Sequence, residues 1–95
     1  MDMPKAIMME EKDNVATLIT SIDKGHQIQI EVGEKKITVQ ALDDIPYGHK
    51  IAFKDIDKGG EVIKYGEVIG RSTDHIKAGC HVHIHNIESL SLGNL

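Results

Sequence analysis

The sequence contains few of the residues that mark secreted, membrane-spanning or disulfide-rich proteins. Its 95 residues include one cysteine, Cys80, so no disulfide can form within the chain, and a single thiol is typical of the reducing cytoplasm. There is no run of about 18 apolar residues, which excludes a membrane-spanning helix. Asp2 stands in a weakly apolar N-terminal stretch that differs from a secretory signal. These absences predict a cytoplasmic protein without a membrane partner.

Aromatic residues and a basic surface are also lacking. Besides histidine, the aromatic residues are Tyr47, Phe53 and Tyr65, too few for a platform that stacks nucleic-acid bases. The formal net charge is −4, with acids and bases mixed along the chain, whereas a nucleic-acid surface needs a basic stripe. We therefore expect no nucleic-acid partner. A chain of 95 residues has the length of one domain, 1–95, with little room to enclose a complete active site.

Isoleucine and glycine recur in a four-residue pattern, Ile-x-x-Gly, that begins at Ile22, Ile45, Ile56 and Ile76. We interpret each copy as a core isoleucine followed by a turn whose glycine takes a positive φ. The alternative is that the four copies are ordinary hairpin turns with no shared role in the core. Either interpretation describes a chain that turns often.

Short apolar segments between these corners favour β-strands, because their apolar residues alternate. The expected strands are 27–32, 36–42, 50–53, 62–65, 67–70 and 81–87, with a hairpin turn at Gly33-Glu34. One helix is predicted near residues 14–20, capped by Asp13 or Asn14, with Val15, Leu18 and Ile19 as its apolar stripe. The predicted fold is therefore mainly β, with one short N-terminal helix.

Three histidines spaced by two, His81, His83 and His85, form the first candidate site. On a strand, alternate side chains share a face and lie about 6.5–7 Å apart at Cα, so two imidazoles can bind one metal ion. The pattern therefore predicts a divalent-metal or anion site. The alternative is a polar outer face that binds nothing, with Val82 and Ile84 on the inner face.

Two further strings contain candidate catalytic and binding residues. In Gly48-His49-Lys50, the glycine corner leaves the His49 ring free to project, and Lys50 beside it is a candidate substrate contact. In Lys64-Tyr65-Gly66, the ammonium can hold a carboxylate and the phenol can donate a proton or a hydrogen bond. The catalytic candidates are His49, Lys64 and Tyr65. The alternatives are an exposed corner for His49 and an aromatic residue at the edge of the core for Tyr65.

In combination, these strings resemble the N-terminal SAF domain of the altronate dehydratase (altronate hydrolase) family, over residues 10–88. The strings are Asp13-Asn14-Val15-Ala16, Gly48-His49-Lys50, Lys64-Tyr65-Gly66 and His81-Val82-His83-Ile84-His85-Asn86. Galactarate dehydratase and the small subunit of (2R)-sulfolactate sulfo-lyase are related. The triple-histidine ending is more similar to the altronate and sulfolactate branches. The resemblance leaves 89–95 as a tail or the start of a linker.

The resemblance implies a β-clip fold and a hydro-lyase, a carbon–oxygen lyase of sugar-acid catabolism. Such an enzyme eliminates the C3 hydroxyl of an acidic sugar derivative after loss of the proton α to the carboxylate. The resemblance also implies iron(II) or manganese(II), bound by His81, His83 and His85 in the assembled enzyme. Such an ion polarises the carboxylate and the leaving hydroxyl. Asn86 is the further candidate for substrate binding.

The family's larger C-terminal region, which carries most of the catalytic groups, is absent from these 95 residues. The implied partners are therefore a large catalytic subunit or a C-terminal dehydratase domain, a small sugar acid and, as an option, a second copy in a homo-oligomer. The initial Met1 favours a separate small subunit over a fragment, and we expect no activity from the chain alone. The alternatives are a non-catalytic sugar-acid-binding or assembly module, and the small subunit of sulfolactate sulfo-lyase.

Overall fold

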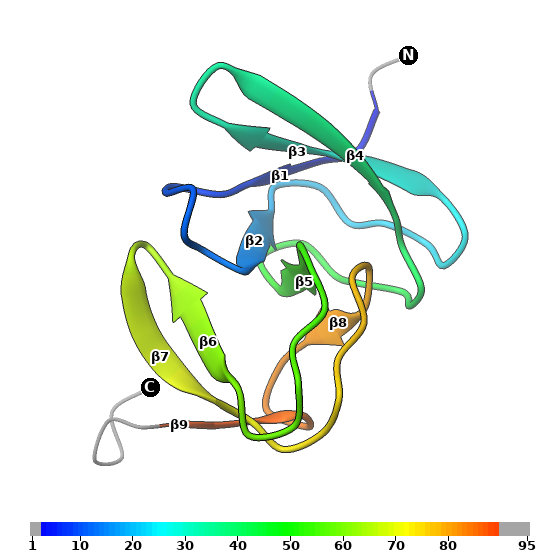
Figure 1. Ribbon diagram of the computed structural model, residues 1–95. Coiled ribbons are helices and arrows are strands. Elements are labelled where there is room, and N and C mark those ends of the chain that lie inside the picture. The colour runs from blue at the N-terminus through cyan, green and yellow to red at the C-terminus, as the bar shows by residue number, and fades with distance from the viewer. Residues whose placement is uncertain (1–2, 90–95) are drawn as a thin grey trace.

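A computed structural model describes residues 3–89, which are built from nine short β-strands (Figure 1). Six strands form one sheet in the order β4-β3-β1-β2-β5-β8, and three form a second in the order β6-β7-β9. Neighbouring strands are antiparallel except β1 and β3, which are parallel. The strands are β1 (Lys5–Ile7), β2 (Val15–Leu18), β3 (Gln27–Val32), β4 (Lys35–Gln40), β5 (Lys50–Ala52), β6 (Glu61–Lys64), β7 (Glu67–Ser72), β8 (His81–Val82) and β9 (Ile87–Ser89).

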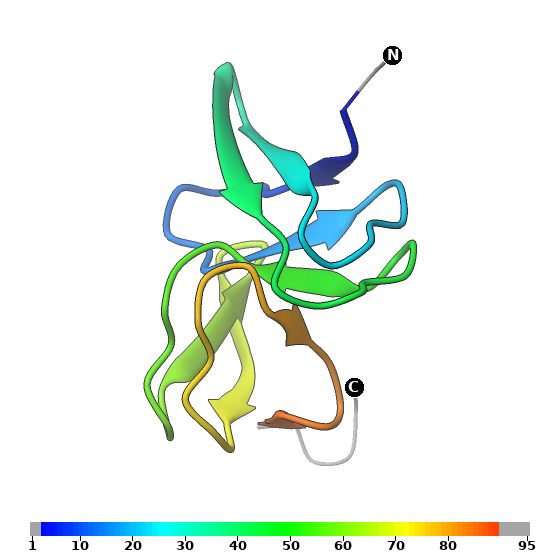
Figure 2. The same ribbon diagram turned by 90° about the vertical axis from the view of Figure 1, so that its right-hand side faces the viewer.

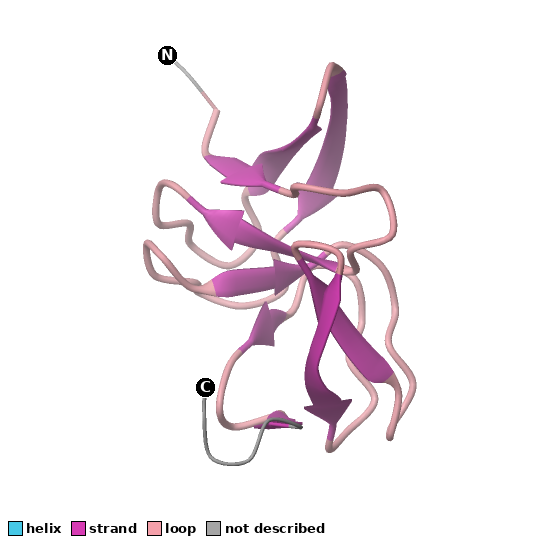
Figure 3. Ribbon diagram, turned by 90° about the vertical axis from the view of Figure 1, so that its left-hand side faces the viewer, coloured by secondary structure: helices cyan, strands magenta, loops and turns pink. Residues whose placement is uncertain are grey.

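The expected helix near residues 14–20 is wrong, because this segment forms β2, which pairs with β1 and β5. Figure 3 shows strands and loops throughout the described part. Val15, Ala16 and Leu18 are all buried, since a central strand is covered on both faces. Such a run lacks the alternation of a half-exposed strand, so its spacing can imitate a helical stripe. Ile19, which completed that stripe, is exposed. Within residues 3–89 no helix suited to crossing a membrane is found.

The predicted strands are confirmed with small changes of their ends, apart from the last. The segment 27–32 is β3, and the turn at Gly33 joins it to β4 with a φ of 58°. The predicted strand 81–87 is wrong in its middle, because β8 ends at Val82 and a turn separates it from β9. Of the predicted tail 89–95, Ser89 belongs to β9 and the rest lies outside the described residues.

The four Ile-x-x-Gly corners meet in two pairs. Ile22 and Ile45 exchange two backbone hydrogen bonds, and so do Ile56 and Ile76. All four isoleucines are buried, and the glycines that end the corners have φ between 82° and 96°. The interpretation as core isoleucines followed by left-handed glycines is therefore confirmed.

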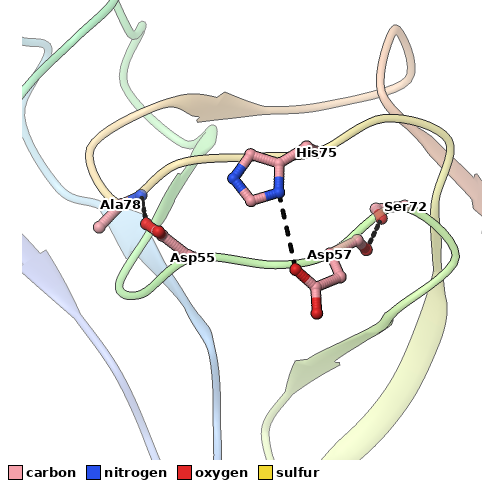
Figure 4. Close-up of polar contacts among 5 residues, drawn as sticks. All are labelled: Asp55, Asp57, Ser72, His75 and Ala78. Atoms are coloured by element: carbon pink, nitrogen blue, oxygen red, sulfur yellow. Dashed lines mark hydrogen bonds and ion pairs between the residues drawn. The ribbon is translucent and has the colours of Figure 1, made fainter.

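An aspartate that precedes one corner of each pair holds the opposite corner in place. The Asp44 carboxylate accepts a hydrogen bond from the Lys24 N–H at 2.7 Å. Asp55 accepts one in the same way from the Ala78 N–H at 2.8 Å (Figure 4). The two pairs are thus built alike, and the second pair leads directly into β8.

Two hydrophobic clusters lie on opposite faces of the β2–β5 pair. Ala16 and Ile51 belong to the cluster shared with β1 and β3, whereas Val15 and Ala52 belong to the cluster shared with β6 and β8. Adjacent residues of one strand point to opposite faces, so β2 and β5 form the central layer. In Figures 1 and 2 the β3–β4 hairpin lies on one side of this layer and the β6–β7 hairpin on the other.

The buried Asp13 fastens the β6–β7 hairpin to the central layer. Its carboxylate accepts hydrogen bonds from the N–H groups of Glu10, Tyr65 and Gly66 at 3.1, 3.1 and 2.7 Å. The side chain of the neighbouring Asn14 bonds the backbone of β6 through both its oxygen and its nitrogen. The Asp-Asn pair, predicted to cap a helix, therefore satisfies backbone groups distant in the sequence.

Asp13→Asn is expected to lower the free energy of unfolding by about 1–2 kcal/mol. The amide replaces one acceptor oxygen by an NH₂ group, which cannot accept the N–H bonds that this oxygen receives. Chemical unfolding in urea measures the change, with the exposed Asp23→Asn as the matched control. Equal stability of the two variants would contradict a role for Asp13 in holding the hairpin.

Candidate functional site

The pairing of β5 with β8 brings the Gly48 corner beside the histidine segment. In this antiparallel ladder Lys50 lies opposite Val82 and Ile51 lies opposite His81. Continuing that register by one residue places His49 opposite His83. Their rings stack with centroids 4.1 Å apart. Residues that are more than 30 positions apart in the sequence thus share one end of the sheet.

Three imidazoles form a compact cluster at this end of the sheet. One ring nitrogen each from His49, His81 and His83 lies within 4.8 Å of the others. His49 Nδ1 and His81 Nε2 lie 2.9 Å apart. Only one of these two nitrogens can carry the proton between them, because two N–H groups would repel. The His85 ring lies beside His81, with centroids 5.1 Å apart, outside this set of three nitrogens.

The turn after β8 is shaped by Asn86, whose side chain is buried. Its amide oxygen accepts the His83 N–H at 2.9 Å, and its amide nitrogen donates to the His81 carbonyl at 2.8 Å. This turn stands where a strand was predicted, so the alternation of side chains expected for 81–87 does not extend past Val82. Ile84, which was expected on the inner face, is 74% exposed. Substrate binding by Asn86 stays a prediction, while its side chain clearly holds the histidine turn.

Burial and mutual repulsion favour the neutral forms of His81 and His83. Burial lowers the pKa of His81, and the charges that His85, His49 and His83 would carry lower it further. The pKa of His83 is lowered first by burial and then by His49 and Lys50. Metal ions bind the unprotonated nitrogen, so both shifts favour metal binding at neutral pH.

The donor set fits a divalent transition metal. Two nitrogens bound to one ion at about 2.0–2.1 Å each lie roughly 3–3.4 Å apart, close to the 2.9 Å between His49 and His81. Imidazole ligands suit iron, zinc, copper and nickel, whereas manganese favours oxygen ligands. Of the two ions that the family resemblance implied, iron(II) fits this cluster better.

A groove of about 480 Å³ opens beside the cluster, and His83 belongs to both. Its lining residues are Lys50, Lys64, Tyr65, Glu67, Val68, Ile69, His83, Ile84, Ile87 and Ser89. Burial lowers the pKa of Lys50, and the nearby charge of Lys64 lowers it further. The two ammonium groups therefore share one region, where a bound anion would relieve their repulsion.

Tyr65 stands at the rim of the groove in an unusual backbone conformation. Its φ is 56° and that of Gly66 is 76°, so the two residues form a tight hairpin turn with both φ angles positive. The Lys64 ammonium lies 4.8 Å from the centre of the Tyr65 ring. A bulky residue rarely adopts this conformation, and such outliers concentrate at functional sites.

A family model described as the altronate/galactarate dehydratase SAF domain matches residues 4–90. The chain belongs to this family. This SAF domain is 40% identical over 80 residues to altronate dehydratase of Escherichia coli, covering 84% of the chain and 15% of that protein. It is 32% identical over 87 residues to altronate dehydratase of Bacillus subtilis, covering 92% and 17%. The resemblance seen in the sequence is confirmed.

A third relative differs in length from these two. This SAF domain is 35% identical over 74 residues to (2R)-sulfolactate sulfo-lyase subunit alpha of Chromohalobacter salexigens, covering 76% of the chain and 79% of that subunit. The chain therefore spans less than a fifth of the altronate dehydratases that it matches but most of the sulfo-lyase subunit. In the relatives, the domain is either a small subunit or one part of a larger dehydratase.

The metal-free SAF domain is expected to lose stability as the pH falls below about 6.5, the ordinary histidine pKa. The pKa values of His81 and His83 are lowered in the folded chain. Between the lowered values and about 6.5, the unfolded chain binds more protons, so stability rises with pH in that window. Urea unfolding at pH 7.5 and 5.5 measures the slope, which His81→Gln should flatten and the exposed His26→Gln should not. An unchanged slope in His81→Gln would refute this.

Proposed function

We propose that this SAF domain forms one wall of the active site of a hydro-lyase of the altronate dehydratase type, acting on an acidic sugar derivative. One observation carries the proposal: two lysines, Lys50 and Lys64, meet in a groove that shares His83 with a three-imidazole cluster. Such convergent polar groups in a concave site are typical of small-molecule binding. The single cysteine, Cys80, supports a cytoplasmic location.

In this proposal the lysines bind the carboxylate of the substrate. Lys50 is half-buried, and the charge of Lys64 adds to the desolvation that lowers the pKa of its ammonium. A carboxylate between the two would restore favourable charge pairing and form charge-assisted hydrogen bonds. Tyr65, which also lines the groove, would donate a hydrogen bond or a proton to a leaving oxygen.

His49, His81 and His83 would hold a divalent ion, for which iron(II) is the better match. The ion, when bound, would polarise the carboxylate and the leaving hydroxyl. This assignment moves His49 from the predicted catalytic residues to the ligands and leaves His85 beside them. Among residues 3–89, these three nitrogens are the one group of side-chain atoms found close enough together to hold a metal ion. Because these three histidines would bind the ion, none of them is free to act as the base. We therefore assign removal of the proton α to the carboxylate to a larger catalytic partner.

Elimination of sulfite from sulfolactate is the second candidate function. Two relatives are named (2R)-sulfolactate sulfo-lyase subunit alpha, and one of them is 44% identical to this chain over 54 residues. Both reactions begin from a small acid with a carboxylate. A groove with two ammonium groups suits either substrate, and only the leaving group differs.

The isolated chain is expected to show no measurable turnover of altronate, galactarate or sulfolactate, because it supplies one wall of a site. Turnover should appear when a large dehydratase polypeptide is co-purified with it. Coupled assays of the keto acid and of released sulfite separate the two reactions. Turnover by the pure chain would refute the need for a partner. A complex that binds these acids without converting them would support the alternative, a non-catalytic binding or assembly module.

A further inference from the structure

Five of the ten residues that line the groove are aliphatic or aromatic, and three of these five are exposed. Ile84, Tyr65 and Val68 are 74%, 55% and 40% exposed, and Ile69 and Ile87 line the groove with them. We call these five residues the apolar wall. Contiguous exposed apolar side chains beside polar groups are typical of protein interaction sites. In Figure 2 the β6–β7 hairpin and the turn that follows β8 lie in the same half of the molecule.

Hydrogen bonds hold the backbone of the two turns that carry Tyr65 and Ile84 of the apolar wall. Ile84 lies in the turn held by Asn86, which bonds the backbone of both His81 and His83. Tyr65 lies in the turn whose N–H groups bond the buried Asp13 carboxylate. A backbone that is already held in place loses little conformational freedom on binding. The exposure of this wall is thus built into the fold.

The proposed substrate does not account for the apolar wall. A small acid with hydroxyl groups needs hydrogen-bonding partners, and burying a hydroxyl against Val68 or Ile84 would cost free energy. Lys50, Lys64 and His83 supply the polar contacts of the groove. The wall therefore fits apolar side chains of a polypeptide.

The position of the last matched residues identifies this polypeptide. The family match ends at residue 90, and Ile87 and Ser89 line the groove. The domain matches the N-terminal region of altronate dehydratase. In such a protein the remaining polypeptide, more than four-fifths of its length, would start beside the groove.

We propose that the apolar wall is the docking surface for a separate catalytic subunit, the counterpart of the polypeptide that follows the SAF domain in altronate dehydratase. The docked region presents apolar side chains to Tyr65, Val68 and Ile84 and closes the groove over the lysines. This inference rests on the proposed function, in which a larger partner completes the site. Excluding water from the groove would also strengthen the charge interactions within it.

The test compares two double variants that carry the same new charges. Val68→Asp/Ile84→Asp changes the apolar wall, and Ile19→Asp/Ile37→Asp changes two exposed isoleucines outside it, which are 45% and 37% exposed. Each tagged chain is expressed in its source organism. A captured polypeptide counts only if mass spectrometry shows similarity to altronate dehydratase outside the SAF domain. Its affinity for each purified chain is then measured by calorimetry, with melting temperatures to confirm folding.

We expect the wall variant to bind this polypeptide at least about tenfold more weakly and the control variant to match the parent. Equal binding by both variants would overturn the inference and leave the proposed function standing. Failure of the parent chain to capture such a polypeptide would overturn both. A dimer of the parent that the wall variant converts to a monomer would identify a second copy as the occupant. Tighter binding by a chain ending at Ser89 would identify residues 90–95 instead.

Discussion

His83→Ala in the assembled enzyme is expected to lower turnover by at least about 100-fold with little change in melting temperature. His83 is the one histidine of the three-imidazole cluster that also lines the groove. In the proposed function, its replacement removes a ligand of the metal ion and a group that faces the substrate. Its backbone N–H still bonds Asn86, so the turn should persist. A partly exposed side chain away from the core changes stability by only about 0.5 kcal/mol.

The measurement is turnover, bound metal and melting temperature for the variant and the parent complex. His26→Ala is the matched control, because His26 is exposed and lies outside the cluster. His49→Ala and His81→Ala should behave like His83→Ala, and His85→Ala should have a smaller effect on bound metal. Unchanged turnover after each of these four single replacements would leave a polar surface without a catalytic role.

The second large effect is expected at Gly79, where Gly79→Ala should lower the free energy of unfolding by about 2–4 kcal/mol. The φ of Gly79 is +96°, a conformation that strains any residue with a Cβ. An added Cβ would also overlap the backbone carbonyl of Gln40 and crowd Leu42. This close approach is needed because the Gly79 carbonyl accepts the Leu42 N–H at 2.8 Å. The Gln40 carbonyl belongs to the backbone, so it cannot move without disturbing the end of β4.

Comparison with Gly25→Ala distinguishes the two causes of destabilisation in Gly79→Ala, the strained φ and the overlap with Gln40. Gly25 ends an equivalent corner with a φ of +93°, but no atom lies within 4 Å of the place that a Cβ would occupy. Its replacement should cost about 1 kcal/mol, and urea unfolding of the two variants gives the difference directly. If both variants lose the same stability, the contact between Gly79 and the end of β4 has no energetic weight.

Much of the fold could be predicted because its strands are half-exposed and its corners need glycine. The segment 27–32 alternates, since Ile28, Ile30 and Val32 are buried between more exposed residues. β2 could not be predicted, since both of its faces are covered and its local pattern also fits a helix. β1, only three residues long, carries too few residues for any period to be read.

The residue types in the sequence indicated the chemistry of the candidate site, but they did not show which of these residues come together in it. His49, Lys50, Lys64 and the histidine triplet all lie at the cluster or the groove. Alternation grouped His85 with His81 and His83, whereas the folded chain brings the nitrogen of His49 into that set. No local signal marks the turn held by Asn86, because its hydrogen bonds depend on how β8 ends.

The sequence by itself determined the family, the β-rich fold and the chemical groups available, since periodicity, turn glycines and residue types are local properties. The tertiary structure decided which groups meet. The register of β5 with β8 placed His49 opposite His83, and the buried Asp13 fixed the hairpin that carries Lys64 and Tyr65. Both depend on hydrogen bonds between segments far apart in the chain, which no short stretch of sequence encodes.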